Sequence, residues 1–121
     1  MSEAAFVILV LLFVKHFIID FILQTDEQVK SKGIYLDWPG VVHSMQHGLG
    51  TFVIFFVFTD AITALVVGIV DFLIHYHVDW SKININKKYN YTPMDKQFWV
   101  WLGADQLAHS LTYVWLVWGL S

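Results

Sequence analysis

The sequence predicts an all-α fold, an integral membrane four-helix transmembrane bundle with both termini outside. Three observations support this prediction: the composition, four long apolar segments and the distribution of the lysines. Hydrophobic residues make up 57% of the chain and charged residues only 14%, which is too apolar for an ordinary soluble domain. The 121 residues are enough for one small domain, so we expect a single transmembrane domain over residues 1–121.

The first apolar segment, Ala4–Leu23, is close to the length of about 20 residues that an α-helix needs to cross a bilayer. Glu3 precedes this segment, whereas a cleavable signal peptide begins with positive charge and ends at a small-residue cleavage site. We therefore expect a retained membrane helix at this end of the chain.

A polar connection separates the first two apolar segments and contains a predicted short surface helix. Thr25 and Gln28 have the spacing of a capping box, and Gly33 is a suitable residue for the end of this helix. The second membrane helix is predicted over Val41–Phe58, with Asp37 as a candidate N-cap before it.

The third and fourth membrane helices are predicted over Ala61–Val78 and Phe98–Leu120. Only Thr59 and Asp60 separate the second helix from the third, which predicts a tight hairpin. A polar loop over residues 80–97 is expected before the fourth. None of the segments shows the alternation of barrel strands, and a bilayer admits only helices or closed barrels, so we expect four membrane-spanning helices.

The lysines predict the orientation of these helices. Most of them lie in or beside the first and third connections: Lys30, Lys32, Lys82, Lys87, Lys88 and Lys96. Cytoplasmic loops are rich in basic residues, so we expect these connections in the cytoplasm and both termini outside. This predicts a multi-pass protein of the bacterial inner (cytoplasmic) membrane. No arginine is present and no basic patch is interleaved with aromatic residues, so nucleic acid is not an expected partner.

Each predicted membrane helix carries two potential metal ligands four residues apart. Residues at this spacing share one helix face, with Cβ atoms about 5–6 Å apart. Every pair lies toward the cytoplasmic end of its helix, so an up-and-down arrangement brings all the pairs to one depth. The residues are His16, Asp20, His43, His47, His75, Asp79, Asp105 and His109.

These pairs are costly in a bilayer unless they face one another. A charged side chain at the centre of a membrane helix costs about 2.5–3.5 kcal/mol on insertion scales, so the groups need mutual pairing, water or a metal ion. The chain has no cysteine, and a set of imidazoles and carboxylates favours zinc, with manganese or iron as alternatives. Soluble di-metal bundles place such ligands on facing helices in the same way. The sequence therefore predicts one or two divalent metal ions.

Other polar residues are expected to support this site by hydrogen bonds to the ligands or to a substrate. The candidates are Gln24, Thr51, Asp71 and Gln106. Lys15 lies at about the depth of Asp71, which predicts an intramembrane ion pair. Its angle on the helix also leaves contact with a neighbouring helix or subunit as an alternative. This lysine and the small size of the chain favour a homo-oligomer.

Four motifs, HFIIDFILQ, VVHSMQHG, DFLIHYHVDWSK and DQLAH, resemble in this order those of a family of small bacterial and phage integral membrane proteins, catalogued as domain of unknown function 3307. The resemblance covers nearly the whole chain and implies no established activity. The motif positions that it implies are His16, Asp20, Gln24, His43, His47, Asp71, His75, Asp79, Lys82, Asp105, Gln106 and His109. The pattern is also similar, more loosely, to that of membrane-bound metal-dependent hydrolases.

The predicted site favours a metal-dependent hydrolase acting on a lipid or lipid-linked substrate. A bound metal would lower the pKa of water, Asp105 or Asp79 would act as the base, and Lys82 would hold a phosphate or other anionic head group. A proton or divalent-cation transporter or channel is the alternative, since such proteins also use intramembrane His and Asp chains. The nearly apolar outer halves of the helices argue against a continuous path through one protomer. A haem-binding or structural bundle, or a small membrane protein acting on a host partner, is a further alternative.

Overall fold

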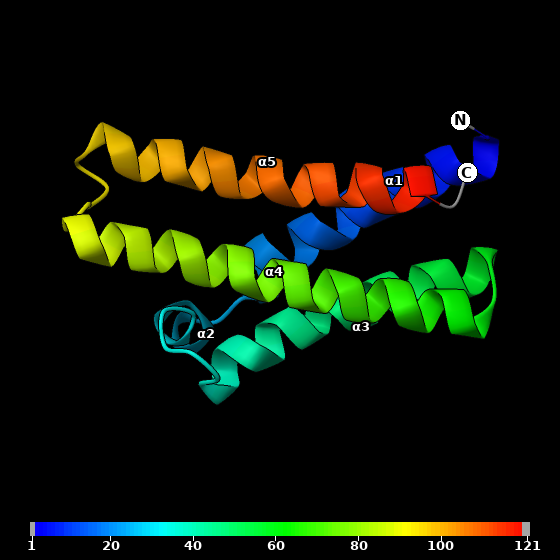
Figure 1. Cartoon of the computed structure of the whole chain (residues 1–121), viewed down its shortest axis with the longest axis horizontal. Helices are drawn as coiled ribbons and strands as arrows, with labels where there is room; N and C mark the ends of the chain where they lie inside the picture. The colour runs from blue at the N-terminus through cyan, green and yellow to red at the C-terminus, as the bar shows by residue number, and fades with distance from the viewer. Residues whose placement is uncertain (1, 120–121) are drawn as a thin grey trace.

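The computed structural model describes residues 2–119, and this part of the chain is built from helices joined by short connections (Figure 1). Residues 2–119 contain no strand, so the predicted all-α class is confirmed. The helices are α1 (Glu3–Phe17), the π-helical turn η1 (Ile18–Leu23), α2 (Asp26–Ser31), α3 (Trp38–Phe58), α4 (Ala61–Tyr89) and α5 (Lys96–Gly119).

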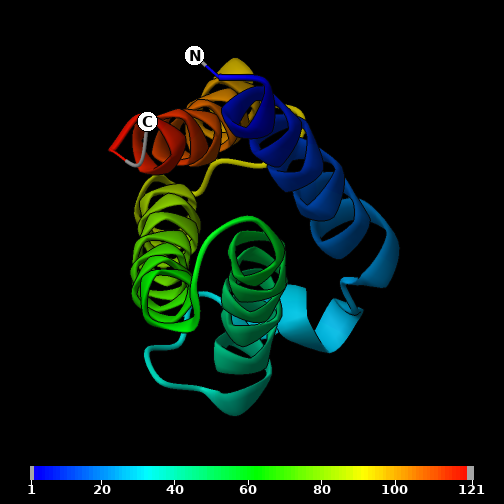
Figure 2. The ribbon, with the colours of Figure 1, turned by 90° about the vertical axis from the view of Figure 1, so that its right-hand side faces the viewer.

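The four long helices run in alternating directions (Figure 1). The two chain ends and the α3–α4 turn lie at one end of the molecule, and α2 and the α4–α5 connection lie at the other, which we name the α2 end. Seen end-on, α1 packs against α3 and α5, and α4 packs against the same two helices (Figure 2). One face of each long helix is therefore turned toward a shared interior.

Three of the described helical segments are long and apolar enough to cross a membrane, judged by length and composition: Glu3–Leu23, Trp38–Phe58 and Ala61–Tyr89. α5 is not among them, although it has 24 residues. Its sequence includes four tryptophans, whose amphipathic rings favour the membrane interface over the hydrocarbon core. The structure thus supports association with a membrane through three helices, and the fourth span stays a prediction.

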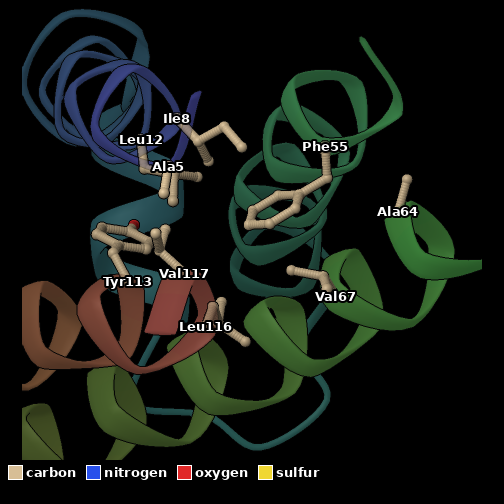
Figure 3. Close-up of a cluster of buried hydrophobic side chains, with 9 residues drawn as sticks. All are labelled: Ala5, Ile8, Leu12, Phe55, Ala64, Val67, Tyr113, Leu116 and Val117. Carbon is tan, nitrogen blue, oxygen red and sulfur yellow. The ribbon is translucent and has the colours of Figure 1, made fainter. Parts of the chain in front are cut away.

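A cluster of buried apolar side chains closes the interior at the end near the two termini (Figure 3). All four long helices contribute to it. Its members are Ala5, Ile8, Leu12, Phe55, Ala64, Val67, Tyr113, Leu116 and Val117. Toward the α2 end, most buried side chains are polar or charged instead. The interior therefore has one apolar half and one polar half.

The connection between α1 and α3 confirms the predicted capping box. Thr25 Oγ1 accepts from the backbone N–H of Gln28, and Gln28 Oε1 accepts from the backbone N–H of Thr25, both at 3.1 Å. α2 ends at Ser31, shortly before the predicted glycine. Asp37 precedes α3 as predicted, but its carboxylate accepts from Ser31 Oγ at 2.6 Å and does not cap the helix. This bond ties the end of α2 to the start of α3.

Thr59 and Asp60 form the predicted tight turn between α3 and α4. Asp60 caps α4 by accepting from the backbone N–H and the hydroxyl of Thr63, both at 2.8 Å. These hydrogen bonds, the backbone one foremost, hold the pKa of the Asp60 carboxyl below its usual range. Beyond the turn the helices approach closely, because a Cβ added to Gly68 would lie 2.9 Å from the carbonyl oxygen of Gly48.

α4 extends to Tyr89, well beyond the predicted end at Val78, so the prediction of a loop over residues 80–97 is wrong for residues 80–89. Ser81 and Asn84 donate from their side chains to the backbone carbonyls four residues earlier, at 2.7 and 2.8 Å, which makes them compatible with the helix. The helix ends at Asn90, whose backbone is left-handed with a φ of 55°.

Candidate metal centre

The eight predicted ligand residues lie together in the polar half of the interior, and each is at most 9% exposed. The four-residue spacing places both members of a pair on one helix face. The alternating directions of the helices then bring the pairs to one level. They are His16 and Asp20 from α1 and η1, His43 and His47 from α3, His75 and Asp79 from α4, and Asp105 and His109 from α5.

One group of ligand atoms surrounds the carboxylate of Asp20. Asp20 Oδ1 lies 2.7 Å from His47 Nε2 and 3.0 Å from His43 Nε2. It lies 3.8 Å from His75 Nε2. The ligand atoms of the four residues lie within 4.8 Å of one another, close enough to hold one metal ion. Asp20 belongs to η1, and short π-helical turns are frequent at functional sites.

A second group joins Asp79 to two histidines. Asp79 Oδ2 lies 3.1 Å from His75 Nε2, and Asp79 Oδ1 lies 3.1 Å from His109 Nε2. Their ligand atoms also lie within 4.8 Å of one another. His75 belongs to both groups, and its ring stacks on those of His47 and His109 with centroid distances of 3.7 and 3.9 Å. The two groups therefore adjoin, which suits one or two ions.

Both imidazole nitrogens of His43 and both of His75 have no hydrogen-bond partner within residues 2–119. The two Nε2 atoms lie 3.0 and 3.1 Å from carboxylate oxygens, but not in hydrogen-bonding geometry. A buried polar atom left without a partner costs about 1–3 kcal/mol. A divalent cation would accept the lone pairs of both Nε2 atoms, so the residues fit a metal ion.

His16 and Asp105 lie at the edge of the cluster, outside both groups. His16 Nε2 lies 2.9 Å from Gln106 Oε1, and its Nδ1 lies 2.8 Å from the hydroxyl of Tyr113. Asp105 Oδ2 accepts from Gln106 Nε2 at 3.1 Å, and its Oδ1 lies 3.4 Å from His109 Nε2. The role of these two residues as metal ligands stays a prediction.

The other predicted supporting residues lie on either side of the cluster. Gln24 Nε2 donates to the backbone carbonyl of Asp20 at 3.0 Å. Thr51 donates to Asp71 Oδ2, which lies 3.1 Å from Lys15 Nζ. The predicted ion pair between Lys15 and Asp71 is therefore confirmed, and this lysine is not left for a neighbouring subunit.

Lys15 also connects this ion pair to the histidines. Its Nζ lies 3.2 Å from His47 Nδ1 and donates to the hydroxyl of Tyr113 at 3.1 Å. Sequence analysis missed Tyr113 as a residue of the site. A signal was available, because Tyr113 follows His109 by four residues and so continues the same helix face.

Two lysines reach the cluster from the α2 end. Lys82, predicted as a site residue, has its Nζ 3.3 Å from Asp105 Oδ2. Lys32 Nζ lies 3.2 Å from Asp79 Oδ2, and the residue is 7% exposed. Sequence analysis assigns Lys32 only to a cytoplasmic loop. The packing of α2 against α3 buries it, and no local pattern of residues indicates that tertiary contact.

His77 lies outside the cluster. It is exposed on α4, and its Nε2 lies 2.9 Å from the hydroxyl of Tyr35. Its neighbour in the cluster, His75, is only two positions away on the same helix. His77 is therefore a matched control for substitutions of the buried histidines.

The chain matches the model of a family described as "Protein of unknown function (DUF3307)" over residues 8–120. The match spans every residue of the cluster described above. No match was found among curated proteins or among solved structures. The looser likeness to membrane-bound hydrolases gains no support from these comparisons.

Proposed function

This chain belongs to the DUF3307 family of proteins of unknown function, and we propose that it is a metal-dependent hydrolase of the bacterial inner membrane, acting on a lipid or lipid-linked substrate. One observation carries the proposal. The buried His/Asp cluster brings ligand atoms together in two adjoining groups, beside a groove between α4 and α5. The proposed arrangement is a four-helix transmembrane bundle with both termini outside.

The contacts of α5 support its place as the fourth span. α5 packs against α1 and α4, which are both apolar enough to cross a membrane. It also supplies Asp105 and His109 to the buried cluster. Without α5 at the same depth, that cluster would face hydrocarbon at a cost of several kcal/mol per polar group. In the described part of the chain the loop lysines gather at the α2 end, which supports placing that end in the cytoplasm.

The proposed metal is zinc, with manganese or iron as alternatives, because its ligands would be imidazoles and carboxylates. The residues that would hold it are those of the two groups described above. A divalent cation bound there would polarise an ester bond and lower the pKa of water. The remaining tasks, which are to orient groups and to move a proton, fall to side chains of the chain itself.

Asp105 is the proposed general base. Its Oδ1 and Asp79 Oδ2 both have no hydrogen-bond partner within residues 2–119, but of the two residues Asp105 is the one that lines the groove between α4 and α5. Gln106 donates to the other oxygen of Asp105 at 3.1 Å and would orient the carboxylate. Asp79, the second candidate, has each oxygen 3.1 Å from a histidine Nε2. That position suits a metal ligand better than a base, which needs an oxygen that faces the substrate.

The shape of the polar interior favours hydrolysis over transport. A transporter or channel needs polar groups along the whole path through the membrane. Here the polar residues end at the ion pair of Lys15 and Asp71, and the apolar cluster of Figure 3 lies beyond it. Leu12 and Phe55 in that cluster are fully buried. Within residues 2–119 the apolar cluster therefore interrupts the polar path that a transporter or channel would need.

A lipid assay tests the proposal. Purified protein is incubated with bacterial polar lipid extract, with zinc or with a chelator, and the lipids are analysed by mass spectrometry. We expect a hydrolysis product that requires the metal and is lost in Asp105→Asn, while Asp26→Asn, at an exposed position of α2, retains it. If the metal-loaded wild-type protein releases no product, the hydrolase proposal is wrong.

A further inference from the structure

We propose that Lys32 and Lys82 bind a phosphate group beside the metal centre, and that this phosphate belongs to a membrane lipid whose hydrocarbon chain lies in the groove between α4 and α5. The inference names a substrate class and therefore rests on the proposed function. It adds Lys32, a buried lysine that the hydrolase argument does not use, to the half-buried Lys82 and the apolar groove beside it.

The two lysines pair with carboxylates that both lie near His109 in the cluster. Lys32 is 7% exposed, and the side chain of Lys82 is 13% exposed. Their ammonium groups lie 3.2 and 3.3 Å from the carboxylates of Asp79 and Asp105. Both carboxylates approach the same atom, His109 Nε2, at 3.1 and 3.4 Å. The lysines therefore reach neighbouring points at the α2 end of the metal centre.

The net charge of this site depends on the metal. Asp20, Asp79 and Asp105 face two ammonium groups, which leaves one negative charge when the histidines are neutral. One divalent cation would change this to one positive charge, and two cations to three. A net positive charge in a low-dielectric interior favours an anion, and lysine is a common phosphate ligand. The metal-loaded site therefore has the charge that a phosphate requires.

The groove between α4 and α5 offers room for the chain of the lipid. It has a volume of about 440 Å³ and is lined by four polar residues, His77, Ser81, Lys82 and Asp105, among apolar neighbours. Those neighbours include Ile74, Val78, Ile85, Trp101, Ala104 and Ala108. A site with a cation at one end and apolar walls suits a molecule with an anionic head and a hydrocarbon tail.

A second apolar groove, between α1 and α3, fits this ligand less well. It has a volume of about 520 Å³ and reaches Lys15. Lys15 pairs with Asp71 at 3.1 Å, and Asp71 belongs to neither group of metal-ligand atoms. A bound metal would therefore not free Lys15 to bind an anion, whereas it would compete with Lys32 for Asp79, which belongs to the second group.

Binding to two probes tests the inference. Zinc-loaded protein in detergent is titrated with inorganic phosphate by calorimetry and with dioleoyl phosphatidic acid by native mass spectrometry. We expect Lys32→Met and Lys82→Met each to weaken binding of both probes about tenfold or more, because each removes a charged hydrogen bond. Lys88→Met, at an exposed lysine near the end of α4, is the control and should bind as the wild type does.

Comparison of the two probes distinguishes a lipid phosphate from the phosphate of a soluble compound. A lipid site predicts that phosphatidic acid binds at least about tenfold more tightly than inorganic phosphate, since the tail adds buried apolar area. It also predicts that Ala104→Phe, which fills the groove, weakens the binding of phosphatidic acid but not that of inorganic phosphate. Equal affinity for the two probes would assign the site to a soluble phosphate compound and overturn the lipid assignment.

Metal content, measured on the same samples, separates this inference from the proposed function. If zinc is bound but neither lysine variant changes phosphate binding, the phosphate site is wrong and the metal centre stands. If no metal is bound and phosphate still binds through the two lysines, the hydrolase proposal fails and the phosphate site stands. If neither probe binds to the wild-type protein, the inference is overturned.

Discussion

Lys15 and Asp71 form an ion pair with side chains that are only 7% and 2% exposed. Removal of one partner from such a pair leaves an uncompensated buried charge, which costs about 3–5 kcal/mol. We therefore expect Lys15→Met to lower the free energy of unfolding by about this amount. The double variant Lys15→Met/Asp71→Leu should recover most of the loss. Unfolding in detergent, followed by tryptophan fluorescence, measures both effects.

Lys88→Met is the control for this experiment, because Lys88 is exposed at the end of α4. It should unfold with the wild-type midpoint. Equal stability of Lys15→Met and Lys88→Met would contradict the picture of a dry ion pair and would mean that water reaches the polar half of the interior.

For individual residues, the sequence predicts much of the buried His/Asp cluster. The spacing of His43 and His47, repeated on every long helix, identifies residues that the structure does bring together. Lys32 and Tyr113 escape prediction for different reasons. A lysine in a polar connection is usually solvated, and a tyrosine in a membrane helix usually marks the interface, so only the tertiary contacts reveal their positions.

α3 and α4 depend on close contact between two glycines. A Cβ at Gly68 would lie 2.9 Å from the carbonyl oxygen of Gly48, and this neighbour is backbone that cannot rotate away. We expect Gly68→Ala to separate the helices and to lower the midpoint of thermal unfolding. Gly103→Ala is the control, since a Cβ at Gly103 meets no atom within 4 Å. It should leave stability unchanged or raise it by about 0.5–1 kcal/mol.

A midpoint for Gly68→Ala equal to that of Gly103→Ala would show that the crossing of α3 and α4 tolerates a wider separation. Circular dichroism during heating provides the measurement. The helical content at low temperature checks that both variants fold.

The boundaries of the elements show what local patterns miss. The asparagines and lysines after Val78 are typical of a loop. Ser81 and Asn84 nevertheless fit within α4, because their side chains donate hydrogen bonds to backbone carbonyls of the same helix. The π-helical turn at Asp20 also has no signal in the sequence, because it depends on how α1 packs at the cluster. Apolar length and capping residues, by contrast, predict the α3–α4 turn directly.

In the whole molecule, the alternating helix directions explain how the ligand pairs, which recur on each long helix at four-residue spacing, form a single buried cluster. The pair at the end of α1 and in η1, the pair near the start of α3 and the pairs near the middle of α4 and α5 come to one level because neighbouring helices run in opposite directions. The membrane span of α5 is harder to predict, since its tryptophans, its one aspartate and its histidine make it less apolar than the other three helices. Its place depends on contacts with α1 and α4.

Topology can be measured directly, because the chain has no cysteine. Ser2→Cys and Asn90→Cys place a single thiol at exposed positions on opposite ends of the molecule. We expect a membrane-impermeant maleimide to label Ser2→Cys in spheroplasts with an intact inner membrane, and Asn90→Cys only after permeabilisation. The reverse pattern would place the α2 end outside, and labelling of both in intact spheroplasts would contradict the three membrane spans that separate Ser2 from Asn90.

The metal content of the folded protein tests the central claim most directly. Inductively coupled plasma mass spectrometry is applied to detergent-purified wild type, His43→Ala/His47→Ala and the exposed control His77→Ala. The metal centre predicts one or two ions of zinc, manganese or iron per chain in the wild type and the control, and a loss of metal in the double variant. Folded wild-type protein without metal, or a double variant that retains the full content, would contradict it.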